Sequence, residues 1–324
     1  MSLKDVAAEA GVGFGTASRT LSDSGYVAEG TRRRVLEAAD RLGYRPNRLA
    51  AGLRSNRSRL IALLVPDYTN EFYARGSAAI ARCLRDLGYQ LIIATSSNGT
   101  EERDAIESLA EYHVDGIVRV PVDPDLDARV SCPVVELNRR SNLPRVPAVL
   151  CDDRSGFRAL TEALLERGHR RIAMIVGEQN FSTSLERAAG YREAIAGTDV
   201  PSRVLFGSFD SRWGEQATRE IFSDEESITA IIAASPRIAS GAVAACVKMG
   251  VRVPDDLAFA SYDDPEWFDF WGSGIRSFVP PLEEMARRAV EVLLDRLESP
   301  DSLPETIVLP GRTHEGGSIG VGLA

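Results

Sequence analysis

From residue 60 onward, short apolar runs alternate with longer stretches in which apolar residues recur every three or four positions. The short runs have the length of buried strands, and the longer stretches have the period of amphipathic helices. The predicted strands are 61–65, 91–95, 116–120, 134–137, 149–151, 172–176, 204–206, 230–234, 257–260 and 275–278. The predicted helices include 72–87, 103–112, 156–167, 185–196, 240–249 and 281–297. Because this alternation occurs as two similar halves, it predicts two doubly wound parallel-sheet lobes with a ligand cleft between them.

The first 60 residues follow a different pattern, with three short helical segments and no strand signal. Ser2 and Asp5 have the spacing of a capping box, and Gly11 is a typical residue just after a helix end. A second helix is predicted over about 14–21, and a third ends at Gly43. The residues of the third helix expected to face inward are Val35, Leu36, Ala39 and Leu42. Three short helices with a tight turn after the first predict an all-α helix-turn-helix domain.

Charge is distributed unevenly between these two parts. The whole chain has a formal charge of −9 and a pI of about 5.1, which by themselves argue against a nucleic-acid partner. The first 60 residues hold eleven basic and six acidic residues, a net charge of +5, so that the remainder carries −14. A basic segment on an acidic body is typical of a nucleic-acid-binding appendage.

Several spaced N-terminal motifs point to one family. They are Leu3-x-Asp5-Val6-Ala7-x-x-Ala10-Gly11-Val12, then Thr16-x-Ser18-Arg19-x-Leu21, then Gly43-Tyr44-x-Pro46-Asn47. In this order they resemble the DNA-binding signature of the LacI/GalR family of bacterial transcriptional regulators. Residues 11–15 also resemble a glycine-rich nucleotide-binding loop. Such a loop should follow a strand, whereas this one follows an amphipathic helix, which argues against that interpretation.

The resemblance implies that the second helix lies in the major groove of DNA. It places the variable specificity positions at Phe14 and Gly15 and a guanine-contacting arginine at Arg19, for which the alternative is a solvated surface arginine. The implied phosphate contacts are Ser2, Thr16, Ser18 and Tyr26.

The next segment resembles the family's hinge helix, which enters the minor groove as a pair in a dimer. Asn47 and Arg48 begin the implied DNA-contacting segment, and Leu53 matches the leucine that wedges into a base step. The alternative is an inert, arginine-rich linker. The expected domains are a helix-turn-helix headpiece over 1–46, a hinge helix and linker over 47–59, and an effector-binding and dimerisation core over 60–324.

Two positions depart from the family pattern in the headpiece. Gly13 and Ala28 stand before the second and third helices, where the family usually has a small hydroxyl residue. Because a serine or threonine at such a position caps the helix, we expect the headpiece to be marginally stable.

The core also resembles this family, whose core is like a periplasmic sugar-binding protein. The supporting stretches are Val65-Pro66-Asp67, Val114-Asp115-Gly116-Ile117, Gly168-His169-Arg170-Arg171, Glu186-Arg187, Val253-Pro254-Asp255-Asp256 and Asp263-Asp264. The resemblance implies an N-lobe of about 60–153 and 279–303 and a C-lobe of about 154–278 and 304–324. The implied effector-binding residues are Phe72, Tyr73, Asn138, Arg187, Phe209, Ser235 and Asp263.

This residue set suits a polyol or sugar-like ligand. Aromatic faces pack on apolar ring faces, while Arg187 and Asp263 would form directional hydrogen bonds to hydroxyls. The alternatives are a structural ion pair between Arg187 and Asp263, and an ordinary core role for Phe72 and Tyr73.

One departure in the cleft bears on the ligand's charge. Where the family commonly has Asn-Asp on the cleft wall, this chain has Ser235-Pro236-Arg237. A carboxylate and an amide are lost and a cation is gained, which favours an effector other than a neutral hexose, for example one with a carboxylate or phosphate. Trp267 and Trp271 either close over the ligand or fill a core near the loops.

Other classes of function are disfavoured. No apolar run reaches the 18 or so residues of a membrane span, no secretion signal is visible, and the four cysteines are scattered, which predicts a cytoplasmic protein with reduced thiols. The three histidines have no partner at metal-ligand spacing, and no catalytic constellation stands out. We therefore expect no metal, no cofactor and no enzyme.

The sequence thus predicts a homodimeric, ligand-responsive transcription factor, a repressor whose affinity for double-stranded operator DNA is controlled by a small sugar-like effector. The alternative is a cytoplasmic sugar-binding protein with a degenerate headpiece, which Gly13, Gly15 and Ala28 suggest. An enzyme acting on a nucleotide or sugar is the third hypothesis.

Overall fold

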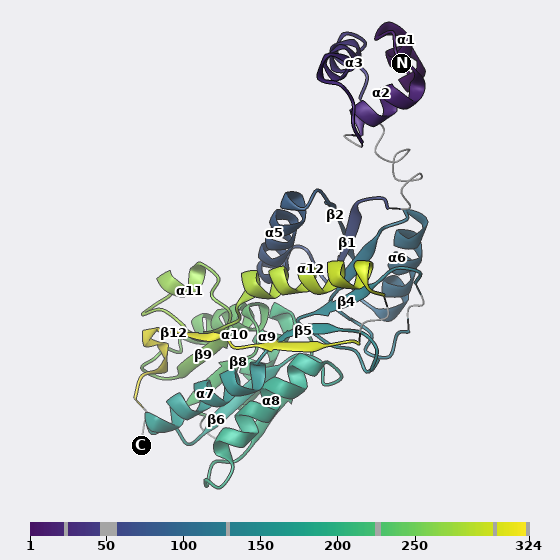
Figure 1. Cartoon of the computed structure of the whole chain (residues 1–324). Coiled ribbons are helices and arrows are strands. Elements are labelled where there is room, and N and C mark those ends of the chain that lie inside the picture. The colour runs from purple at the N-terminus through teal and green to yellow at the C-terminus, as the bar shows by residue number, and fades with distance from the viewer. Residues whose placement is uncertain (23–24, 46–56, 128–129, 224–227, 301–302, 322–324) are drawn as a thin grey trace. The chain divides into compact units, whose positions relative to one another are not determined.

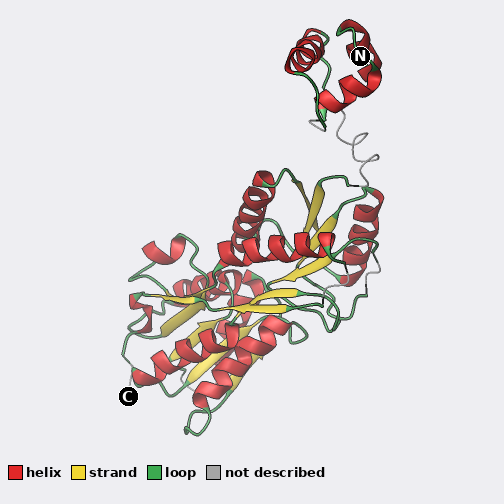
Figure 2. Ribbon diagram, in the orientation of Figure 1, coloured by secondary structure: helices red, strands yellow, loops and turns green. Residues whose placement is uncertain are grey.

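The computed structural model describes all residues except 23–24, 46–56, 128–129, 224–227, 301–302 and 322–324. It divides into two compact units, Met1–Leu60 and Ile61–Ala324, which we call the headpiece and the body. The headpiece is helical, whereas the body combines helices with strands (Figures 1 and 2). Among the described residues, no helix is both long and apolar enough to cross a membrane.

The headpiece consists of three helices around a small core: α1 (Leu3–Glu9), α2 (Phe14–Leu21) and α3 (Glu29–Arg41). The predicted capping box is confirmed at α1. The Ser2 hydroxyl accepts the Asp5 amide at 3.4 Å, and the Asp5 carboxylate accepts the Ser2 amide at 2.7 Å. Neither α2 nor α3 has a side-chain cap, because Gly13 and Ala28 occupy their N-cap positions.

The inward orientation predicted for Leu36 is wrong. Its side chain is 48% exposed, and Ala38 faces the core in its place. Val35, Ala38, Ala39 and Leu42 follow the i, i+3, i+4, i+7 spacing of one helix face. Leu36 lies about 100° around the helix from Val35 and therefore falls outside this stripe.

The first sheet of the body, in the N-lobe, has the order β11-β5-β4-β3-β1-β2. Its strands are β1 (Leu60–Val65), β2 (Gln90–Thr95), β3 (Gly116–Arg119), β4 (Val134–Leu137), β5 (Ala148–Cys151) and β11 (Thr306–Leu309). The pairings from β11 to β1 are parallel. The helices of this lobe are α5 (Glu71–Asp86), α6 (Gly99–Glu111) and α12 (Leu282–Glu298).

The second sheet, in the C-lobe, has the order β12-β10-β9-β8-β6-β7. Its strands are β6 (Ile172–Val176), β7 (Arg203–Phe206), β8 (Ala230–Ala233), β9 (Ala258–Tyr262), β10 (Arg276–Val279) and β12 (Arg312–His314). Only the edge pairing of β12 with β10 is antiparallel among the described pairings of this sheet. Its helices are α7 (Asp153–Glu166), α8 (Ser182–Ile195), α9 (Ser211–Ser223), α10 (Pro236–Met249) and α11 (Trp267–Phe270).

The chain crosses between the lobes three times. It passes from β5 to α7 at Asp152 and from β10 to α12 at Pro280-Pro281, close to the expected positions. The third crossing lies between β11 and β12, at Pro310-Gly311, whereas the sequence prediction placed it near Leu303. Residues 306–309 therefore belong to the N-lobe sheet rather than the C-lobe, because β11 pairs with β5, with Ile307 opposite Val149.

Two helices begin four residues earlier than predicted, at side chains that cap them. Asn98 accepts the amides of Thr100 and Glu101, so α6 starts at Gly99 rather than 103. Ser235 accepts the amide of Ile238, so α10 starts at Pro236 rather than 240.

Candidate functional site

The first turn of α2 is open to solvent. Phe14 is 46% exposed, Gly15 is exposed, and a Cβ placed on Gly15 would meet nothing within 4 Å. Arg19 is also exposed, and its Nε donates to the Gly15 carbonyl at 3.2 Å. Because this bond uses one of five guanidinium donors, the others can reach a partner. The turn thus presents one apolar side chain, bare backbone and one cation.

The residues that the family resemblance implies as phosphate contacts are exposed to different degrees. Tyr26 is 91% exposed, whereas Thr16 and Ser18 are half-buried on α2. Ser2 is exposed, and its hydroxyl already accepts the Asp5 amide. The other implied DNA contacts, Asn47, Arg48 and Leu53, lie outside the described residues.

The body contains a cleft pocket of about 150 Å³ whose walls come from both lobes. Its lining follows the carboxyl ends of five strands, as expected for a doubly wound fold. The N-lobe side consists of Pro66, Asp67, Asn70, Phe72, Tyr73, Asn138 and Arg139. The C-lobe side consists of Thr183, Arg187, Phe209, Asp210, Ser235, Pro236, Arg237 and Tyr262. Six of the seven effector residues implied by the sequence are therefore brought together here.

Aromatic rings form much of this wall. Phe72 and Tyr73 meet edge to face with their centroids 5.3 Å apart, and Phe72 lies 6.3 Å from Tyr262. Phe72 is 6% and Tyr73 8% exposed. Both also belong to the hydrophobic cluster that contains Leu63 of β1 and Tyr262 of β9. The core and ligand-facing interpretations of these two residues are thus compatible.

Arg187 is fixed on the floor of the cleft pocket. Its Nε donates to Asp153 at 2.8 Å, and its Nη1 donates to the Ala234 carbonyl at 2.6 Å. The guanidinium also lies 3.7 Å from the centre of the Tyr262 ring. The helix that carries it packs tightly on α7, because a Cβ at Gly190 would overlap the Arg154 carbonyl. Burial raises the pKa of Asp153, against the lowering effect of Arg187.

Asp263 does not line the cleft pocket and does not pair with Arg187. It has no exposed surface, adopts φ 69°, and accepts Nη2 of Arg75 at 2.9 Å. Arg75 also donates to Asp264 at 3.1 Å, so α5 of the N-lobe is tied to the end of β9 in the C-lobe. Burial raises the pKa of Asp263 to about 6, although Arg75 opposes this shift. The alternative of an ion pair between Arg187 and Asp263 is therefore wrong: each pairs with another residue, because the turn after β9 directs Asp263 towards α5.

Sequence reasoning missed Arg139, which is 5% exposed beside Asn138. Its guanidinium lies 3.9 Å from the centre of the Phe181 ring and 4.8 Å from that of Phe209. The available signal was a charged residue directly after a buried strand. Trp267 and Trp271 pack against the hydrophobic cluster of the C-lobe that contains Phe259 and Phe268.

Comparison with known proteins identifies the family. Residues 2–47 match bacterial regulatory proteins of the lacI family, and residues 161–319 match a periplasmic binding protein-like domain. The HTH-type transcriptional regulator CelR of Thermobifida fusca is 34% identical over 327 residues, covering 96% of each chain. The chain belongs to the lacI family of bacterial regulatory proteins.

A second relative and a solved structure are also similar along nearly the whole chain. The ribose operon repressor of Bacillus subtilis (strain 168) is 30% identical over 312 residues, covering 95% of each chain. A solved structure of a transcriptional regulator CelR–cellobiose complex is 32% identical, with a TM-score of 0.74, and the match covers 98% of this chain and 99% of that chain. The predicted fold class, a helix-turn-helix headpiece with a periplasmic-binding-protein-like core, is confirmed, and the chain is a DNA-binding transcriptional regulator.

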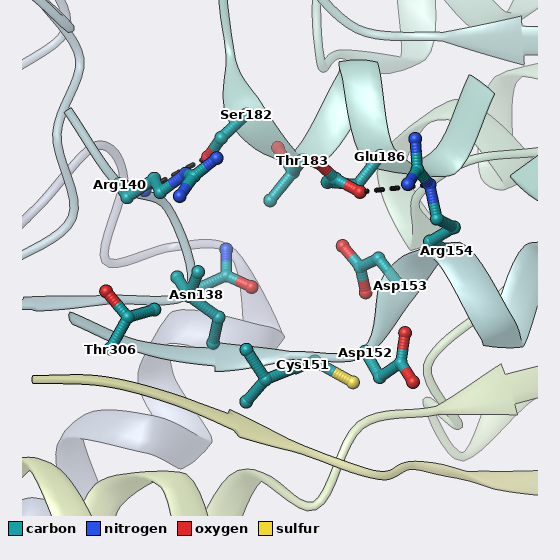
Figure 3. Close-up of a pocket in the computed structure, with 12 residues that line it drawn as sticks. Asn138, Arg140, Cys151, Asp152, Asp153, Arg154, Ser182, Thr183, Glu186 and Thr306 are labelled. Carbon is teal, nitrogen blue, oxygen red and sulfur yellow. Dashed lines mark hydrogen bonds and ion pairs between the residues drawn. The ribbon is translucent and has the colours of Figure 1, made fainter. Parts of the chain in front are cut away.

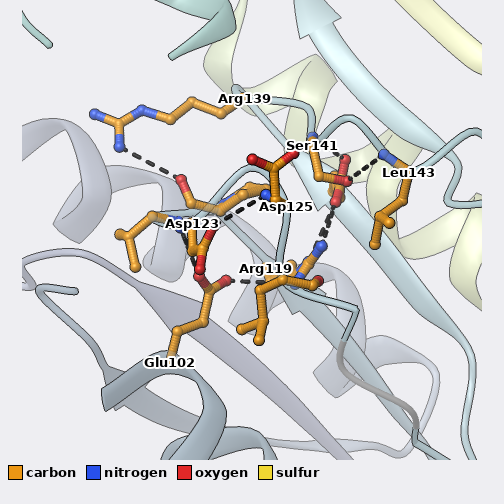
Figure 4. Close-up of polar contacts among 11 residues, drawn as sticks. Glu102, Arg119, Asp123, Asp125, Arg139, Ser141 and Leu143 are labelled. Carbon is orange, nitrogen blue, oxygen red and sulfur yellow. Dashed lines mark hydrogen bonds and ion pairs between the residues drawn. The ribbon is translucent and has the colours of Figure 1, made fainter. Parts of the chain in front are cut away.

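A buried ionic network holds the loop that brings Asn138 and Arg139 to the cleft (Figure 4). Arg119 donates to Glu136 at 2.7 Å and to Glu102 at 3.5 Å, and all three side chains are at most 2% exposed. The second Glu136 oxygen accepts the Ser141 amide at 2.7 Å. This bond anchors the segment after β4, so the network positions two cleft residues without lining the pocket itself.

Proposed function

We propose that this regulator is a homodimeric repressor whose operator affinity is controlled by a small sugar-like effector bound in the cleft pocket. The observation that carries the proposal is a pocket walled by both lobes in a member of the lacI family. A ligand held by both lobes stabilises one lobe arrangement over others, which is what coupling between two sites requires. The CelR–cellobiose complex of a relative supports a sugar-like ligand.

The wall of the cleft pocket supports a ligand with both apolar ring faces and hydroxyls. Phe72, Tyr73 and Phe209 supply flat apolar surfaces, while Asn138 and Ser235 supply polar atoms. Arg187 already has two protein acceptors, so it serves as a preorganised donor.

Two further cations favour an anionic group on the effector. Arg237 lines the cleft pocket, and its side chain is 41% exposed. Its Nη1 lies 3.9 Å from the Asp67 carboxylate, which is equally exposed. Arg139 has a buried Nε without a hydrogen-bond partner. A carboxylate or phosphate near these guanidinium groups would gain charge-assisted hydrogen bonds.

In the headpiece, we propose that α2 enters the major groove, with Arg19 donating to a guanine edge and Phe14 contacting a thymine methyl. Ser2, Thr16, Ser18 and Tyr26 would contact phosphates and fix the register of the helix. Asn47, Arg48 and Leu53 would add minor-groove contacts from the hinge. In this proposal the domain boundaries remain 1–46, 47–59 and 60–324.

DNA binding is tested with the full chain on its own upstream DNA by fluorescence anisotropy. We expect Arg19→Ala to weaken operator binding about 10- to 100-fold, because one bidentate base contact contributes about 1–3 kcal/mol. Arg33→Ala is the matched control, since it removes the same charge from an exposed pair with Glu37 on α3. Equal effects of the two variants, or undiminished binding by Arg19→Ala, would reject this mode of recognition.

The charge of the effector is tested by titration calorimetry with hexoses and the corresponding sugar acids and phosphates. We expect the anionic sugars to bind more tightly, and Arg237→Gln to remove most of that preference while leaving neutral sugars unaffected. Tighter binding of an unmodified hexose than of its anionic derivatives would contradict the anionic assignment alone. If the bound ligand weakens binding of the protein to the operator, it is an inducer, and if it strengthens that binding, it is a corepressor.

The degenerate-headpiece alternative predicts a sugar-binding protein that does not bind operator DNA. The packed headpiece core, the intact capping box and the open first turn of α2 favour DNA binding instead. The relatives are transcriptional regulators rather than enzymes, which supports the expectation that this chain has no catalytic role.

A further inference from the structure

A second cavity of about 180 Å³ lies where the chain crosses between the lobes (Figure 3). We call it the crossover pocket. Its walls are the β5–α7 crossing with Asp152 and Asp153, the first turns of α8 with Ser182 and Glu186, and the edge strand β11 with Thr306. Of the proposed effector contacts, Asn138 alone also lines this pocket.

Two buried polar side chains in the crossover pocket lack partners. Asn138 is 7% and Thr183 4% exposed, yet Asn138 Oδ1 and Thr183 Oγ1 make no hydrogen bond. Figure 3 shows the Asn138 amide and the Asp153 carboxylate facing a common space, with Thr183 at its edge. Because an unpaired buried polar atom is destabilising, this arrangement indicates a hydrogen-bonding ligand.

The two pockets share walls. Asn138 and Thr183 line both the crossover pocket and the cleft pocket. Asp153 lines the first and Arg187 the second, and their side chains are 2.8 Å apart. A ligand in one pocket therefore contacts side chains that also shape the other.

The charges around the crossover pocket balance in number: Asp152, Asp153 and Glu186 are matched by Arg140, Arg154 and, beside Asp153, Arg187. Asp153 is paired with Arg187, and Glu186 lies 3.4 Å from Arg154. The wall thus offers both donors and acceptors, with apolar surface from Leu150 and Val308. A hydroxyl can donate and accept at once, and a sugar ring also has apolar faces, so an uncharged hydroxyl-rich ring fits better than an ion.

We propose that the crossover pocket is a second binding subsite for an uncharged, hydroxyl-rich ring. The ring is either the second unit of a disaccharide effector or a separate monosaccharide. This inference rests on the proposed function, because it assumes a sugar-like effector in the cleft pocket. The subsite is formed by the β5–α7 crossing and by β11, which leads into the third crossing. A ring bound there therefore also affects how the two lobes are arranged.

The experiment uses a bulky side chain on the exposed edge strand. Thr306→Trp fills the crossover pocket from β11, and Thr306 itself does not line the cleft pocket. Glu305→Trp is the matched control, because side chains alternate along a strand and its neighbour Thr306 is the one that faces the pocket. Both positions are exposed, so both variants should fold.

A panel of neutral and acidic monosaccharides and disaccharides, including glucose and cellobiose, is first screened by thermal shift on the full chain. Each hit is then titrated calorimetrically into the wild type and both variants. If the ring belongs to a disaccharide, we expect Thr306→Trp to weaken disaccharide binding at least 10-fold and leave monosaccharide binding unchanged. If it is a separate monosaccharide, Thr306→Trp lowers the stoichiometry from two to one. In both cases Glu305→Trp binds as the wild type does.

The inference is overturned if Thr306→Trp changes neither affinity nor stoichiometry for any sugar that the wild type binds. It is also overturned if no member of the panel binds. In the first case the cleft pocket still binds its sugar and the proposed function stands. In the second case, operator binding by the same preparation shows whether the regulator role survives without a sugar effector.

Discussion

The headpiece and the body are held together in different ways. Among the described residues of the headpiece, the buried members of its hydrophobic cluster are alanines and valines: Val6, Ala7, Ala10, Ala17, Val35, Ala38 and Ala39. Partly buried against them are Leu3, Val12, Leu21, Leu42 and Tyr44. The two hydrophobic clusters of the body also contain phenylalanine, tyrosine, isoleucine and leucine from both sheets and their helices. Because burial stabilises in proportion to apolar area, at about 25 cal/mol per Å², the headpiece gains far less from its core.

Helix capping differs in the same direction. In the body, Asn70, Asn98 and Ser235 cap α5, α6 and α10 with side-chain hydrogen bonds. In the headpiece α1 has such a bond but α2 and α3 lack one, as do α8 and α12 of the body. The comparison indicates a stable sensor joined to a DNA reader of low intrinsic stability, for which DNA contacts would supply part of the missing order.

The largest effect is expected from the buried network in the N-lobe. Arg119→Met leaves the Glu102 and Glu136 carboxylates without their cation, so we expect the body to lose about 3–5 kcal/mol of stability. Denaturant unfolding followed by tryptophan fluorescence measures this loss, because Trp213, Trp267 and Trp271 all lie in the body.

Arg158→Met is the control for that variant, since Arg158 pairs with Glu162 at an exposed helix surface. We expect less than about 0.5 kcal/mol from it. A loss below about 1 kcal/mol in Arg119→Met would show that the network contributes little, and the contrast between the two units would weaken.

A pH-dependent effect of intermediate size is expected at Asp263. Its pKa is about 6 in the folded chain against 3.8 as the ordinary value, so the native state binds the proton more tightly. The resulting stability is present below about pH 4 and is lost as the pH rises to about 6, amounting to about 3 kcal/mol. We expect wild-type stability to fall by this amount relative to Asp263→Asn between about pH 3 and pH 7, and by about 2 kcal/mol between about pH 4 and pH 6.

Chemical denaturation of the wild type, Asp263→Asn and the exposed control Asp86→Asn at both ends of this range measures the difference. Parallel pH profiles for all three proteins would mean that Asp263 titrates normally. Arg75 and Asp264 face this carboxyl, so their effects are contained in the same measurement.

A smaller effect, confined to the headpiece, is expected from restoring the cap of α3. Ala28→Ser should stabilise the headpiece by about 1 kcal/mol, because the serine hydroxyl can accept an orphan amide of the first turn. Thermal unfolding of residues 1–58 by circular dichroism measures the shift. The wild-type segment should melt with weak cooperativity. A sharp transition well above about 60 °C would show that the headpiece is not of low stability.

The smallest effect is expected at Gly13. Gly13→Ser adds a cap to α2 in open space, since a Cβ there meets nothing within 4 Å. We expect a gain of only a few tenths of a kcal/mol in the same melting experiment, because glycine is itself an acceptable N-cap residue. A loss of stability would instead mean that the turn before α2 does not tolerate a side chain.

The fold could be predicted from the sequence because its elements are locally encoded. Strands such as β6 and β8 are continuous apolar runs, and the capping box of α1 is readable from two residues. The strand β11 was missed because its Thr-Ile-Val-Leu run is short and half exposed. Its lobe became evident only from its pairing with β5.

The candidate site was predicted less completely for a physical reason. Phe72, Asn138 and Arg187 were found because they follow recognisable motifs at strand ends or on helices that reach the cleft. Arg139 carries no motif, and its place over Phe181 depends on a loop fixed by Glu136. Asp263 was expected at the effector, with an ion pair to Arg187 as the alternative, and its pairing with Arg75 could not be foreseen because the two residues are 188 positions apart.

By itself, the sequence determined the helix-turn-helix headpiece, the contrast of a basic N-terminal segment with an acidic body, the two-lobed fold and the family, since periodicity, caps, charge and spaced motifs are local properties. Only the tertiary structure decided which buried charges pair, that Leu36 is exposed, and where the third crossing lies. It alone revealed the crossover pocket, whose walls come from α8, β11 and the β5–α7 crossing. Such features depend on residues distant in the chain meeting in space, where desolvation and geometry select the partners.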